Sequence, residues 1–228
     1  MKKIVFVFLM VIVFGGLHVS AQQNITVVDV GGVNINIPTP SKEYIEVGNN
    51  LRDTLSSIVR DTDKLLCFYV ESPEYKKYVN NSHDSLNMDK YIFIYSSIQS
   101  IRNDFSENRI LMFNKNIIET NISVVKNGVD SLNKILVDSN LLVSYNNYNS
   151  IHTKGIFYHI KDAGGEFKYA IENRFSKNYK SLSTFNSIIV KKKLLYFEIY
   201  CEYKDYESIK WIAEISESWA KAILEANK

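Results

Sequence analysis

The chain has 228 residues, of which 46% are hydrophobic and 23% charged, with 27 Lys and Arg against 25 Asp and Glu. This mixture excludes a disordered, collagen-like or wholly membrane-embedded protein. Three Pro and nine Gly are too few for linker repeats or low-complexity segments. The length suits one large or two small globular domains.

Residues 1–21 have the three-part pattern of a secretory signal peptide. Lys2 and Lys3 precede an uninterrupted apolar run at 4–14, and small residues lead to Ala21. The run is shorter than the roughly 20 residues that a membrane-spanning helix needs. We therefore expect cleavage after Ala21 and a mature protein, residues 22–228, that is periplasmic or secreted and has no stable membrane span.

Cleavage would leave a mature chain without net charge. Residues 1–21 hold two Lys and no acid, so Lys and Arg fall to 25 and equal the 25 Asp and Glu. Such a chain has no overall attraction to nucleic acid or to an anionic membrane, and we expect no nucleic-acid partner. The basic run 191–193 lies between two apolar runs and is interpreted as a solvated turn.

Several pairs of apolar runs predict strands joined by hairpin turns. Gly31 and Gly32 separate runs at 25–30 and 33–37, and glycine tolerates the positive φ of a tight turn. Further pairs flank 162–165 and 191–193. The runs 64–70 and 91–95 are apolar nearly throughout, which is typical of strands covered on both faces.

Helices are expected near 51–60, from Pro73 to Val79, and at the C-terminus. In the last segment, Asp205 is a plausible N-cap. Apolar residues that recur on one side of this helix, opposite its charged residues, are assigned to the core: Trp211, Ile215, Trp219 and Ile223.

These elements together predict a single α+β domain over residues 22–228. We expect a mainly antiparallel sheet with helices packed on both faces and an amphipathic C-terminal helix. Apolar residues also recur at helical spacing from Leu111 to Leu136. This stripe predicts a helix that packs on the sheet, or that associates with a partner, with a break or a hairpin turn at 127–128.

The sequence contains no recognised catalytic or metal-binding motif. His83, His152 and His159 lack the spacing of a zinc site, and no phosphate-binding loop is present. We therefore assign no catalytic, cofactor-binding or metal-ligating residue and expect no cofactor. A hydrolase whose residues meet only in space remains an alternative.

Two cysteines, Cys67 and Cys201, would enter an oxidising compartment, where a disulfide is allowed. Both lie in apolar runs, where a thiol packs as a small hydrophobe, and the alternation of each run directs them to different faces. Both a disulfide and two free thiols therefore remain open.

Tyrosine is the candidate residue type for a ligand or partner surface, because it joins an apolar ring to a polar tip. Tyr145 and Tyr148 lie in a polar, Asn-rich segment that is expected to be a loop. Tyr196 and Tyr200 share one face of the last strand with Glu198 and alternate with apolar residues.

The chain resembles a family of small exported bacterial proteins. The resemblance depends on INIPTPSKEYIEV at 35–47, LLCFYV at 65–70, YIFIY at 91–95, and the ending KKKLLYFEIYCEYKD with WIAEISESWAKAILEAN. More distantly, the layout resembles the PsbP-type α/β sandwich. The resemblance implies a binding or accessory role and supplies no catalytic residues.

The expected function is therefore that of an exported, non-enzymatic binding or accessory protein of the bacterial envelope. Its partner would be an envelope protein or a small ligand. Two alternatives remain: an assembly component that associates through the 111–136 stripe, and a periplasmic hydrolase.

Overall fold

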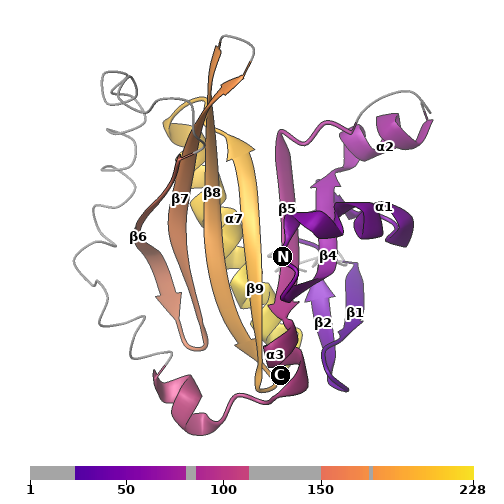
Figure 1. Ribbon diagram of the computed structural model, residues 1–228, viewed down its shortest axis with the longest axis vertical. Coiled ribbons are helices and arrows are strands. Elements are labelled where there is room, and N and C mark those ends of the chain that lie inside the picture. The colour runs from indigo at the N-terminus through magenta and orange to yellow at the C-terminus, as the bar shows by residue number, and fades with distance from the viewer. Residues whose placement is uncertain (1–23, 81–85, 113–149, 175–176) are drawn as a thin grey trace, which may run out of the picture.

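The computed structural model describes residues 24–80, 86–112, 150–174 and 177–228, with parts of β6, β7 and β8 described by their backbone pairing. Its strands form two antiparallel sheets, one of two strands and one of seven. Helices lie against both faces of the larger sheet (Figure 1). The predicted α+β class with a mainly antiparallel sheet is confirmed.

The smaller sheet is the hairpin of β1 (Ile25–Asp29) and β2 (Asn34–Pro38). Its turn contains Gly31 and Gly32, with φ of 65° and 81°, as the sequence predicted. The strand order of the larger sheet is β3-β4-β5-β9-β8-β7-β6. These strands are β3 (Tyr44–Glu46), β4 (Asp63–Glu71), β5 (Lys90–Ser97), β6 (Ser150–Ile160), β7 (Ala163–Arg174), β8 (Lys177–Val190) and β9 (Lys193–Glu202).

The helices of the first half of the chain are short, and the last helix is long. They are α1 (Asn49–Thr54), the 3₁₀ helix η1 (Leu55–Ile58), α2 (Ser72–Asn80), α3 (Ile98–Arg102) and α7 (Tyr206–Glu225). No helix in the described ranges combines the length and the apolar character needed to cross a membrane.

The larger core cluster lies between the sheet, α7 and the hairpin β1–β2. Figure 1 shows α7 behind β8 and β9. Within this cluster Trp219 and Ile223 are fully buried and Ile215 nearly so, whereas Trp211 is half-buried at the margin. The helix begins where sequence reasoning placed it, because the Asp205 carboxylate accepts the Ser208 N–H at 3.1 Å in a capping box.

A second, smaller cluster covers the opposite face of the sheet. Aromatic and aliphatic residues of β4 and β5 form its centre, and apolar residues of α1, η1 and α2 pack on it. Because β4 and β5 are apolar on both faces, both clusters draw on the same two strands.

Two turns differ from the sequence interpretation. The turn between β6 and β7 is centred on Asp162, with φ of 66°, so Gly164 and Gly165 lie inside β7, paired with strands on both sides. The solvated-turn interpretation is wrong for Lys193, which is only 2% exposed. Its ammonium lies 2.8 Å from a carboxylate oxygen of Asp104 and donates to the Ile101 carbonyl at 3.1 Å.

The expectation that the two cysteines point to different faces is also wrong. The register of β4 against β5 shifts between Leu65 and Cys67, so Leu66 and Cys67 both contribute to the larger cluster, as does Cys201. Both thiols are nevertheless free. Cys67 is opposite Ile94 and Cys201 is opposite Lys90, a separation of about 13 Å along β5 that a disulfide cannot bridge.

Candidate functional site

The hairpin β1–β2 is attached to the rest of the fold through the outer edge of β2. Every second residue of this strand directs its backbone polar groups away from β1, and side chains from distant segments bind these groups. The Asn34 carbonyl accepts from Lys191 (2.9 Å), Asn36 exchanges two hydrogen bonds with the Asn227 amide (2.9 and 2.7 Å), and the Pro38 carbonyl accepts from the Trp219 indole (2.7 Å).

In the described part of the chain, the outer edge of β1 has no such attachment. The Val30 N–H donates to the Val33 carbonyl. Because every second residue of an antiparallel strand bonds to the partner strand, the backbone groups of Val28 and Thr26 also bond to β2. The backbone groups of Ile25, Val27 and Asp29 therefore point away from β2. Among the described residues no strand pairs with this edge.

Part of β4 presents a second outer edge. β3 pairs only with the end of β4, from Tyr69 to Glu71. On the β5 side, the Ile98 N–H donates to the Thr62 carbonyl. Backbone groups alternate in direction along a strand, so those of Lys64 bond to β5 and those of Leu65 point away from β5. No described strand pairs with β4 at Lys64–Leu66 on this side.

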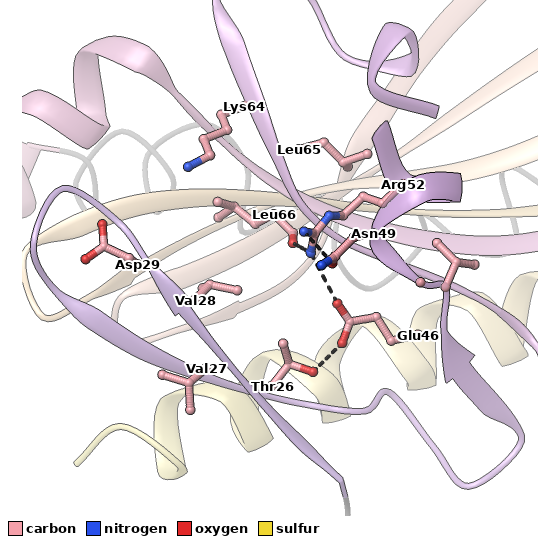
Figure 2. A pocket seen from close by; sticks show the side chains of 12 residues that line it. Thr26, Val27, Val28, Asp29, Glu46, Asn49, Arg52, Lys64, Leu65 and Leu66 are labelled. Atoms are coloured by element: carbon pink, nitrogen blue, oxygen red, sulfur yellow. Dashed lines mark hydrogen bonds and ion pairs between the residues drawn. The ribbon is translucent and has the colours of Figure 1, made fainter. Parts of the chain in front are cut away.

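These two edges line one cleft of about 550 Å³, a volume typical of ligand sites. It is lined by four residues of β1 and three of β4, and not by the inner strands β2 and β5. The lining residues are Thr26–Asp29, Glu46–Asn49, Arg52 and Lys64–Leu66. Figure 2 shows Asp29 and Lys64 toward one end and Glu46 and Arg52 toward the other.

An ion pair and a set of hydrogen bonds close one end of the cleft. Glu46 lies 3.5 Å from the Arg52 guanidinium and accepts a hydrogen bond from the Thr26 hydroxyl of β1 (Figure 2). Arg52 also donates to the Leu66 carbonyl at 2.9 Å and to the Asn49 side chain at 2.9 Å. Its guanidinium thus binds an outward carbonyl of β4 that a neighbouring strand would otherwise bind.

Two buried groups next to Glu46 stay uncharged. Burial, followed by the negative charge of Glu46, raises the pKa of the Cys67 thiol well above its usual range. Burial is likewise the largest cause that raises the pKa of the Tyr69 phenol, and the negative charge of Glu46 also contributes. A thiolate or phenolate is needed for nucleophilic attack, and neither Cys67 nor Tyr69 is among the residues that line the cleft.

The predicted tyrosine surface lies on the other face of the sheet. Tyr200 stacks on Tyr91 with ring centroids 4.7 Å apart, and Tyr196 stacks on Phe185 at 5.4 Å. The buried Glu198 carboxylate accepts hydrogen bonds from Tyr95 (2.9 Å) and Tyr200 (2.7 Å). Burial, followed by Glu198, raises the pKa of Tyr200. Tyr196 and Tyr200 are therefore half-buried members of an aromatic layer.

Most of the remaining candidate residues lie outside the described part of the chain. Tyr145, Tyr148 and His83 lie outside the described residues, as does most of the 111–136 stripe. His152 and His159 lie in β6, opposite Tyr169 and Gly164. In the described part of the chain no group of His, Cys, Asp and Glu is arranged to hold a metal ion.

Sequence reasoning missed Glu46, Arg52 and the β1 edge. One signal was present in the sequence: β1 has apolar residues on both of its faces. Val28 faces the core, whereas Ile25 and Val27 lie on the other face, where the structure shows them to be 54% and 59% exposed. Exposed apolar side chains on an edge strand mark a surface that can pair with another chain.

Comparison with known proteins identifies no family. No family model matches the chain, and no curated protein matches it significantly. Among solved structures, it is similar to the Saccharomyces cerevisiae Ran-binding protein Mog1p, with 11% identity over 90% of each chain and a TM-score of 0.30. At that score the similarity supports no argument about function.

Proposed function

We propose that this chain is an exported, non-enzymatic binding protein whose ligand site is the cleft between β1 and β4. The observation that carries the proposal is that two strand edges with outward backbone donors and acceptors line the same cavity. The signal-peptide pattern of residues 1–21 supports export.

The charges of the cleft favour a neutral or zwitterionic ligand. Asp29 and Glu46 carry negative charge, and Arg52 and Lys64 carry positive charge. Their formal charges cancel, so the cleft does not present the field of one sign that attracts phosphates or nucleic acid. Its specificity must then come from hydrogen bonds and shape.

A thermal-shift screen of the purified protein tests this proposal. The panel contains amino acids, peptides of two to seven residues, sugars and nucleotides, and each positive compound is titrated against two variants. Arg52→Ala removes the guanidinium inside the cleft. Arg60→Ala is the matched control, because Arg60 is exposed and pairs with Asp63 outside the cleft.

A ligand at about 100 times its Kd should stabilise the protein by about 2.7 kcal/mol, which raises Tm by roughly 5–10 °C for a chain of this size. We expect the shift with the unaltered protein and Arg60→Ala, and a much smaller one with Arg52→Ala. Equal shifts in all three proteins, or chemical turnover of the ligand, would contradict the proposal.

The two alternatives depend on other segments. An assembly role would use the stripe that begins at Leu111, and a hydrolase would use one of the three histidines. Both remain predictions of the sequence.

A further inference from the structure

We propose that the ligand of this cleft is one extended peptide segment, which becomes a strand between β1 and β4 and joins the two sheets. The inference rests on the proposed function and names its ligand class: a peptide with apolar side chains at alternate positions. Strand addition of this kind obtains its affinity from main-chain hydrogen bonds.

The two edges of the hairpin carry the first argument. On β2, the outward groups of Asn34, Asn36 and Pro38 are bound by side chains of the fold itself. On β1, the equivalent groups of Ile25, Val27 and Asp29 line or adjoin the cleft, and no described strand pairs with them. A backbone edge recognises another backbone, because both present donors and acceptors at the same spacing.

The position of β4 carries the second argument. Leu65 directs its N–H and carbonyl out of the sheet at the same cleft. The Arg52 guanidinium binds the neighbouring Leu66 carbonyl, which shows that this edge accepts a donor from the cleft side. One inserted strand would therefore find hydrogen-bonding groups on both of its sides.

The size of the cleft favours a single extended segment over a second copy of this chain as the occupant. The β1 edge of another copy would bring β2 with it, and that β2 is fixed to α7 through Asn227 and Trp219. A cavity of about 550 Å³ between β1 and β4 has room for one extended segment and not for a hairpin with its domain. At about 3.3 Å per residue, three to four ligand residues span the four lining positions of β1 and the three of β4.

The side chains of β1 indicate which residues the peptide carries. Val28 faces the core, whereas Ile25 and Val27 lie on the other face and are largely exposed. A strand beside β1 would place every second side chain next to Val27. Apolar residues at those positions would cover Val27, as cross-strand pairs do in a sheet.

Selection from a phage-displayed library of random seven-residue peptides on the purified protein provides the probe. The enriched peptide is synthesised in three forms: unmodified, with backbone nitrogens methylated at odd positions, and with those at even positions methylated. Calorimetry gives the Kd of each form, and amide hydrogen exchange locates the unmodified peptide. Methylation changes only the peptide, so folding of the protein is unaffected.

We expect both methylated forms to bind at least about tenfold more weakly, because a strand between two edges uses the N–H groups of both parities. Exchange of the Val27 and Leu65 amides should slow by at least about tenfold when peptide binds. The Thr26 amide, which already bonds to β2, is the internal control and should change little.

Three results would overturn the inference. Loss of affinity in only one methylated form would mean that the peptide pairs with a single edge. Protection of Val27 that rises with protein concentration alone would mean self-association. Failure to enrich any peptide would remove the ligand class; if a compound of another class still binds through Arg52, the proposed function stands, and if none does, both fall.

Discussion

Replacement of Trp219 by Ala should be among the most destabilising single changes in this protein. The side chain is fully buried, and its ring packs edge-on against Phe197 and Tyr69, with ring centroids 4.8 and 5.7 Å apart. Its indole N–H donates to the Pro38 carbonyl at 2.7 Å. A buried aromatic removes roughly 150–250 Å² from water, which at about 25 cal/mol/Å² amounts to about 4–6 kcal/mol.

Measured losses of stability for large-to-small core substitutions of aromatic residues are about 3–5 kcal/mol. In this case the Pro38 carbonyl also loses its hydrogen-bond donor. We therefore expect Trp219→Ala to cost about 4–6 kcal/mol and to lower Tm by roughly 10–20 °C. Trp219→Phe keeps a ring but loses the N–H, and should cost about 1.5–3 kcal/mol.

Urea unfolding followed by far-UV circular dichroism measures both values, provided that the m-values agree. Trp211→Ala is the control, because Trp211 is half-buried with the Lys90 ammonium 4.7 Å from its ring centroid; it should cost about 1–2 kcal/mol. A loss below about 1 kcal/mol for Trp219→Ala would refute the view that this side chain attaches α7 to the hairpin.

Three further predictions concern the turns and the buried polar groups. Gly31→Ala should cost about 3 kcal/mol or more, because φ is 65° and a Cβ would clash with a backbone carbonyl of α3, whereas Gly32→Ala meets open space and should cost about 1–2 kcal/mol; equal costs in urea unfolding would contradict this. The thiols of Cys67 and Cys201 should resist a thiol reagent at pH 8 and react only on unfolding, because burial raises the pKa of both, to about 12 for Cys201. Recovery of a disulfide between them would contradict this prediction. The hydrogen bond and charge of Lys193 hold the pKa of Asp104 below its usual range. The stability from this pair is therefore present above the usual carboxyl pKa and is lost as pH falls through the lowered value. Lys193→Met should reduce this loss of stability at acid pH, and an unchanged pH dependence would refute the assignment.

Local signals predicted much of the fold. Two glycines between alternating apolar runs specified the β1–β2 hairpin, and an Asp205 cap followed by an apolar stripe specified α7. Each of these signals involves residues that are close together in the sequence, so it can be found without knowledge of tertiary contacts.

The features that sequence reasoning missed arise from contacts between distant segments. Lys193 belongs to a basic run, yet Asp104 and the Ile101 carbonyl bind it in a buried position. The bulge in β4 turned Cys67 to the face of Cys201, and a strand that is apolar on both faces carries no pattern that reveals such a shift.

The candidate site was missed for the same reason. The edge of β1 becomes distinctive only because β2 is bound by Asn227 and Trp219, more than 180 residues later in the chain. The separate predictions of Tyr196 and Tyr200 as a surface came from strand alternation, which identifies a face but not what packs on it.

Amide hydrogen exchange of the free protein is the most direct test of the central claim, which is that β1 presents an available edge. The amides of Val27 and Asp29 should exchange within about tenfold of the rate of an unstructured peptide, while that of Asn36, bound to Asn227 at 2.9 Å, should be strongly protected. Protection of Val27 equal to that of Asn36 would contradict the account, because the edge assigned to the ligand would then be occupied in the protein alone.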